Sequence, residues 1–156
     1  MKLTWARDAS TLQYGDKSIR VVCDVRNELN GERLLSEAPV KTEQADGSDG
    51  VPYMPRPFPL GEWKVTGILP KTNPYEAPEF ISTDAWQFVN EWTEANGHYG
   101  AKSGNQVQDF GYGLHNSTSS TTLGCGRIIE TQDRADLAEA IRSAMDAGET
   151  VILEVV

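Results

Sequence analysis

The chain has 156 residues, of which 38% are hydrophobic and 24% are charged, and its formal net charge is −9. A chain of this size can bury a core without disulfides or metals, and an acidic surface disfavours nucleic acids as partners. The first residues carry charges instead of the apolar run of a secretory leader, and no segment reaches the length of a membrane span. We therefore expect synthesis in the cytoplasm without a signal peptide.

The first half of the chain is predicted to be rich in β-structure. Residues 11–14 lead into a Gly-Asp turn, and the β-branched run 18–25 follows, which indicates a hairpin. Residues 37–56 are polar and end in glycine and proline, so they predict a mobile loop. Alternation over residues 62–68 predicts a strand, and the prolines of residues 70–78 predict another loop.

The second half is predicted to contain two helices and a final strand. Apolar residues recur at helical spacing over residues 83–95, and Asn96-Gly97 would end that helix. A second helix is expected to begin at a cap provided by Thr131 or Asp133 and to end at Gly148. The apolar run 151–156 suits a strand buried on both faces. Together these elements predict one α+β domain over residues 1–156, mainly β.

One segment carries the residues of a nucleophilic site. His115 is followed by a loop rich in hydroxyl side chains and, ten positions later, by Cys125. A free thiol is only partly ionised at neutral pH, so a catalytic cysteine needs a base beside it, and the loop is long enough to bring the imidazole to the sulfur. Gly124 and Gly126 flank the cysteine without side chains, which would let a substrate carbonyl approach and would aim backbone N–H groups at an oxyanion. Arg127 could hold a substrate carboxylate or lower the thiol pKa.

These residues resemble the L,D-transpeptidase (YkuD-type) catalytic domain. That family has an apolar residue, His and a small residue, then a loop and the pattern Ser/Thr-x-Gly-Cys-hydrophobic-Arg/Asn. Here the match is residues 114–116 and residues 122–127, with Tyr112 where an aromatic residue often precedes the histidine. The upstream Pro-x-Gly strand of the family resembles residues 59–65. The departures are Leu123 in place of the usual histidine, Gly126 in place of a hydrophobic residue, and a shorter loop between His115 and Cys125. The length of this loop is more similar to that of short phage and bacterial domains of uncharacterised function.

The resemblance implies a role for each matching residue. Cys125 would be the acylated nucleophile, His115 its base, and the backbone carbonyl of Asn116 would fix the imidazole. Gly124 and Cys125 would supply oxyanion N–H groups, Thr122 would support the loop, and Arg127 would sit near the substrate or buttress the turn. Gly126 and Tyr112 complete the expected oxyanion and substrate-binding positions. The implied fold has mixed β-sheets or a barrel with one or two helices. The implied reaction is acyl transfer from a peptidoglycan stem peptide to an amine or to water, with no cofactor and no metal.

Other interpretations stay open at this point. A catalytically inactive virion or tail component, or an interaction module, could keep the Gly-Cys-Gly turn for its backbone geometry alone. Cys125 and His115 could instead bind a metal with Asp109 or His98. If the site is enzymatic, we expect a phage particle or a secretion machine to deliver the protein to the cell wall or periplasm, with other proteins of that machine as partners.

Overall fold

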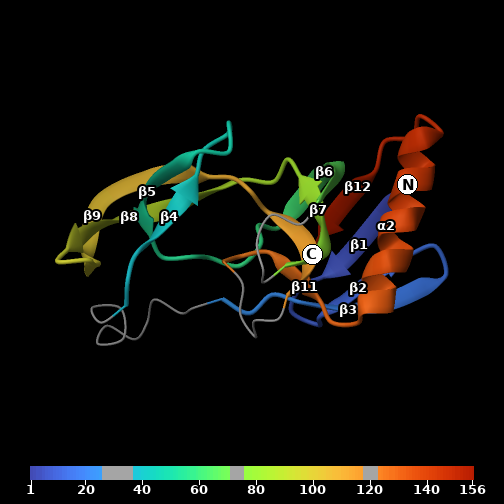
Figure 1. The fold of residues 1–156 in the computed structure, drawn as a ribbon, viewed down its shortest axis with the longest axis horizontal. Coiled ribbons are helices and arrows are strands. Elements are labelled where there is room, and N and C mark those ends of the chain that lie inside the picture. Colours follow the sequence, from blue (N-terminus) through green and yellow to red (C-terminus); the bar gives the residue numbers. More distant parts are fainter. Residues whose placement is uncertain (26–36, 71–75, 118–122) are drawn as a thin grey trace.

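The chain folds into a closed β-barrel, from which a four-stranded sheet extends (Figure 1). The structure is a computed structural model and describes residues 1–25, 37–70, 76–117 and 123–156. The barrel strands are β1 (Lys2–Ala6), β2 (Thr11–Tyr14), β3 (Lys17–Val22), β6 (Gly61–Pro70), β7 (Glu76–Thr83), β10 (Gly113–Ser117), β11 (Gly126–Ile128) and β12 (Ile152–Val155). The second sheet, called here the extension sheet, consists of β4 (Val40–Glu43), β5 (Asp49–Tyr53), β8 (Gln87–Ala95) and β9 (His98–Asp109).

The barrel is mixed, with the strand order β1-β12-β6-β7-β10-β11-β3-β2. The pairs β1–β12 and β10–β11 are parallel, and the other neighbours are antiparallel. The prediction of a mainly β protein of the α+β class is therefore confirmed. The parallel pair β10–β11 holds the histidine of the predicted site, and the predicted cysteine directly precedes β11.

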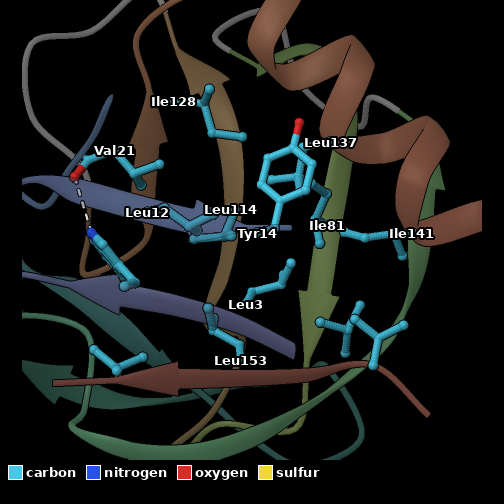
Figure 2. Close-up of a cluster of buried hydrophobic side chains, with 14 of the residues drawn as sticks. Leu3, Leu12, Tyr14, Val21, Ile81, Leu114, Ile128, Leu137, Ile141 and Leu153 are labelled. Carbon is cyan, nitrogen blue, oxygen red and sulfur yellow. Dashed lines mark hydrogen bonds between the residues drawn. The ribbon is translucent and has the colours of Figure 1, made fainter. Parts of the chain in front are cut away.

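The barrel interior is filled by alternate side chains from its strands. Trp5 is fully buried there, and its indole nitrogen donates a hydrogen bond to the carbonyl of Val21 at 3.0 Å. The helix α2 (Thr131–Asp146) lies over the core shown in Figure 2, into which it inserts Leu137 and Ile141. Among the described residues, no helix combines the length and the apolar character needed to cross a bilayer.

The expected hairpin, the strand after Pro59, the second helix and the final strand are all present. β2 pairs with β3 in the register Thr11↔Arg20. The helix begins at Thr131, so Thr131 and Asp133 both lie inside it and the predicted cap at either residue is wrong. The residue at the cap position is Glu130, whose side chain makes no capping hydrogen bond. β12 alternates between half-buried and buried residues, so it does not have the two buried faces that we predicted.

The helix predicted over residues 83–95 is wrong, because residues 87–95 form β8. Asn96 and Gly97 have positive φ angles of 53° and 77°, and Ala95 pairs with His98 across them. Two consecutive residues with positive φ are the signature of a tight hairpin turn. The Asn-Gly pair therefore joins two strands and does not end a helix.

The mobile loop predicted over residues 37–56 is also wrong in part, because β4 and β5 lie within it. These strands pair through a turn in which the Gln44 N–H bonds to the Ser48 carbonyl at 2.8 Å and Asp46 accepts hydrogen bonds from Ser48. Of the loop predicted at the prolines of residues 70–78, residue 70 ends β6, residues 76–78 belong to β7, and residues 71–75 lie outside the described part of the chain.

Candidate active site

The parallel pairing of β10 and β11 decides how the predicted site residues face. Leu114 pairs with Gly126, and His115 pairs with Arg127. Leu114 is fully buried in the barrel core, so the alternation of a strand directs His115 and Arg127 to the outer face. Cys125 directly precedes β11, and its sulfur contacts the carbonyl oxygen of Gly111, two residues before β10.

His115 is held in one orientation by contacts on two sides. Its Nδ1 lies 2.6 Å from the backbone carbonyl oxygen of Asn116. A carbonyl can only accept, so Nδ1 carries the proton and donates it, which leaves Nε2 of the neutral ring as an acceptor. The ring of Phe80 stacks on the imidazole with 5.5 Å between ring centroids. His115 is only 6% exposed, so the ring has little freedom to turn.

A network of buried polar groups in turn fixes Asn116. Its side-chain amide donates to the carbonyl of Ile128 at 2.6 Å and accepts from Nε of Arg134 at 3.1 Å. Arg134 belongs to α2 and also pairs with Glu79 at 2.6 Å. The position of the carbonyl that orients His115 is thereby tied to the helix and to β7.

Cys125 is half-buried and free of any disulfide. Its sulfur donates a weak hydrogen bond to the carbonyl of Gly111, with 3.7 Å between the heavy atoms. Tyr53 lies near Cys125, so a negative charge on the Cys125 sulfur would raise the pKa of the Tyr53 hydroxyl. Burial raises the pKa of Tyr53, and the charges of Asp109 and Cys125 add to that shift. The sulfur is thus bordered by a backbone carbonyl and by a tyrosine that stays protonated.

The two glycines around Cys125 have a structural reason that differs from the one we expected. Gly124 has a φ of 116°, and a Cβ on it would lie 2.6 Å from the carbonyl oxygen of Arg56 and 2.6 Å from the ring of Tyr112. A Cβ on Gly126 would point into the barrel, 2.5 Å from Leu114 and 2.9 Å from Trp5. The space beside both glycines is therefore filled by the protein itself, so the predicted clearance for a substrate is wrong.

Arg127 lies across from His115 on the outer face. Its side chain is 21% exposed, and its Nη2 lies 3.9 Å from the exposed carboxylate of Asp24. Its Nε is buried and has no hydrogen-bond partner among the described residues. The partly exposed end of this guanidinium, two residues after the cysteine, can bind an anionic group that reaches this face.

Tyr112 does not face a substrate, so its predicted contact role is wrong. It is 2% exposed, its ring packs on Phe58, and its hydroxyl donates to Asp109 at 2.7 Å while accepting from Gln87 at 2.8 Å. Burial raises the pKa of Asp109, although hydrogen bonds from Tyr112 and the Glu43 N–H oppose that shift. Tyr112 and Asp109 therefore form a buried polar core beneath the Gly124 turn.

A metal centre finds no support in the described residues, which contain no group of three His, Cys, Asp or Glu side chains arranged to hold an ion. His98 begins β9 and Asp109 ends it, so the two proposed additional ligands lie at opposite ends of a 12-residue strand. His98 is exposed. Thr122, the residue expected to support the loop, lies outside the described residues.

Sequence reasoning missed Phe80, which holds the imidazole, and the contacts of Cys23. The Cys23 sulfur lies 3.4 Å from the Gly124 carbonyl oxygen and 3.3 Å from the Phe58 nitrogen. Phe80 follows a proline-rich run that carried no signal for a site. No protein-family model, curated protein or solved structure matches the chain.

Proposed function

We propose that this protein is a cysteine-dependent acyltransferase or peptidase that acts on peptidoglycan stem peptides, as its resemblance to L,D-transpeptidases implies. The observation that carries the proposal is the parallel pairing of β10, which holds His115, with β11, which Cys125 directly precedes, together with the hydrogen bond from the Nδ1 proton of His115 to Asn116. That tautomer is the one a general base requires, because Nε2 is left to accept a proton.

The reaction would proceed through a thioester. Nε2 of His115 takes the thiol proton of Cys125 as the hydrogen bond from the sulfur to Gly111 is given up. The thiolate attacks a carbonyl carbon of the stem peptide, and the carbonyl electron pair moves to oxygen. Collapse of this intermediate breaks the C–N bond, and the imidazolium returns its proton to the leaving amine. An amine or water then attacks the thioester, which gives a cross-linked or a hydrolysed product and restores the thiol.

Arg127 would contribute to substrate binding. Stem peptides carry free carboxylates, and the partly exposed guanidinium of Arg127 lies on β11, the strand that Cys125 precedes. A charge-assisted hydrogen bond from the guanidinium to a carboxylate would orient the substrate. Delivery to the cell wall by a phage particle or a secretion machine belongs to the same proposal.

The test is incubation with peptidoglycan tetrapeptides, followed by mass spectrometry of both the peptides and the protein. We expect the wild type to form an acyl adduct on Cys125 or to turn over peptide, and we expect Cys125→Ala to do neither. His115→Gln should lower the rate by about 10²–10⁴-fold, the contribution typical of a positioned base. His98→Gln is the matched control, because that histidine is exposed at the start of β9, and it should leave the rate unchanged.

A second measurement separates the enzyme from a catalytically inactive component of the same fold. Cys125 should react with iodoacetamide faster than Cys23, because burial raises the pKa of the Cys23 thiol and leaves little thiolate. Equal, slow labelling of both cysteines, together with no adduct from the tetrapeptides, would favour a virion or tail component in which the turn serves structure alone.

A further inference from the structure

Cys23 directly follows β3, and its thiol bonds to two backbone segments, one at Gly124 and one at Phe58. Its thiol donates to the Gly124 carbonyl at 3.4 Å and accepts from the Phe58 N–H at 3.3 Å. Burial raises the pKa of Cys23, so the thiol keeps the proton that it needs to donate. The side chain therefore fixes the direction of the Gly124 carbonyl.

The direction of that carbonyl also determines the direction of the Cys125 N–H. The two groups belong to one peptide unit, and the chain has no cis peptide bond among the described residues. In a trans peptide, the C=O and the N–H point in opposite directions. With the Gly124 carbonyl turned toward Cys23, the Cys125 N–H points away from Cys23.

Two kinds of contact hold Gly124, which are packing beside its Cα and the hydrogen bond from Cys23 to its carbonyl. Gly124 has a φ of 116°, and its Cα is enclosed by the carbonyl of Arg56 and the ring of Tyr112. A glycine peptide with positive φ can rotate easily in isolation, because no Cβ restricts it. A hydrogen bond to its carbonyl is thus an effective means of selecting one orientation.

We propose that Cys23 is a positioning residue, whose hydrogen bond to the Gly124 carbonyl aims the Cys125 N–H at the oxyanion formed during acyl transfer. This inference rests on the proposed function, because it assigns a supporting role within the same site. A preorganised N–H contributes to catalysis through its direction, and a peptide free to rotate loses that contribution. Cys23 itself touches neither the substrate nor the reacting sulfur in this scheme.

The test compares two reactions of the same sulfur. Iodoacetamide alkylates the thiolate by displacement of iodide at a saturated carbon, so no oxyanion forms. p-Nitrophenyl acetate acylates it: the C–S bond forms, the carbonyl oxygen becomes an oxyanion, and the C–O bond breaks to release p-nitrophenolate. Both reactions need the same thiolate, whereas only the second needs the aimed N–H.

Cys23→Ala, measured in the full-length protein, should slow the acylation of Cys125 by about 10–100-fold, somewhat less than the complete loss of an oxyanion donor. Its alkylation rate should stay within about twofold of the wild type, since the thiolate is unaffected. Cys23→Ser should recover most of the acylation rate, because a hydroxyl can still donate to the Gly124 carbonyl and accept from the Phe58 N–H. Peptide mapping assigns each adduct to its cysteine, and Cys125→Ala gives the background.

The possible failures are distinguishable. If wild-type Cys125 is not acylated at all, both the proposed function and this inference are overturned. If the wild type is acylated but Cys23→Ala is acylated equally fast, only the positioning role is overturned. If acylation and alkylation fall together in Cys23→Ala and also in Cys23→Ser, Cys23 supports the turn or the thiolate in general, and the inference about the N–H is again wrong.

Discussion

Replacing Gly126 by alanine should destabilise the barrel, because the added methyl group would point into its packed interior. An ideal Cβ at this position lies 2.5 Å from Leu114, 2.9 Å from Trp5 and 2.9 Å from Val21. Carbon atoms in contact normally sit about 3.5–4.0 Å apart, so several buried side chains must shift by roughly 1 Å. Overpacking of this kind costs about 1–3 kcal/mol in the free energy of unfolding.

Gly67→Ala provides a matched control for that change. Gly67 also lies in a barrel strand, but nothing lies within 4 Å of a Cβ added there. Both substitutions remove the backbone freedom of a glycine, which favours alanine by about 0.5–1 kcal/mol, so their difference isolates the steric cost. In urea unfolding, a difference of about 2 kcal/mol at a slope of about 2 kcal/mol/M separates the two midpoints by about 1 M.

A double-mutant cycle identifies the clash directly. In a Leu114→Ala background, the closest atom is gone, so Gly126→Ala should cost at least about 1 kcal/mol less than in the wild type. Equal urea midpoints for Gly126→Ala and Gly67→Ala, or additive effects in the cycle, would show that the interior beside Gly126 is not packed as described.

Two further predictions concern buried polar groups. Arg134→Met removes the bonds to Asn116 and Glu79 and should lower the free energy of unfolding by about 3 kcal/mol. This is the lower end for a broken buried pair, because Glu79 still pairs with Arg142. Arg142 is half-exposed, so the control Arg142→Met should cost less than about 1 kcal/mol in urea unfolding. Burial raises the pKa of Asp109, so its favourable contribution is complete below the unfolded pKa of about 3.9 and is lost as pH rises through the folded pKa. Asp109→Asn should therefore gain stability relative to the wild type as pH rises above about 4. A constant or opposite difference across unfolding curves at several pH values would contradict this.

The strands that sequence patterns missed are those of the extension sheet, and the reasons are physical. β8 pairs with β9 through bulges between Asn90 and Trp92 and between Trp92 and Glu94, which break the two-residue period. The remaining aromatic spacing resembles a helical face. β9 is almost entirely polar and is exposed along most of its length, so it carries no hydrophobic alternation. The Asn96-Gly97 turn was the available signal, and it was interpreted as the end of a helix.

The site was easier to predict in its residue types than in its contacts. His115 and Cys125 could be picked out because a loop between a histidine and a glycine-flanked cysteine is an unusual connector. The reasons for the glycines could not be read from the same segment, since the atoms that enclose them come from Trp5, Arg56 and Tyr112. Nor could the segment reveal that Cys23, 101 positions before Gly124 in the sequence, holds the carbonyl preceding the nucleophile.

The barrel packing also explains why a glycine follows Cys125 in this chain. A hydrophobic side chain after the cysteine would occupy the barrel interior, and here Trp5, Val21 and Leu114 already fill that space, which makes glycine the residue that fits. The glycine at position 126 is thus a consequence of the large indole of Trp5 on β1. The candidate site lies on the other face of β10 and β11, where His115 is buried and the Arg127 guanidinium is partly exposed. If that face is catalytic, changes inside the barrel should alter stability more than rate, and changes at Cys125, His115 or Arg127 should do the reverse.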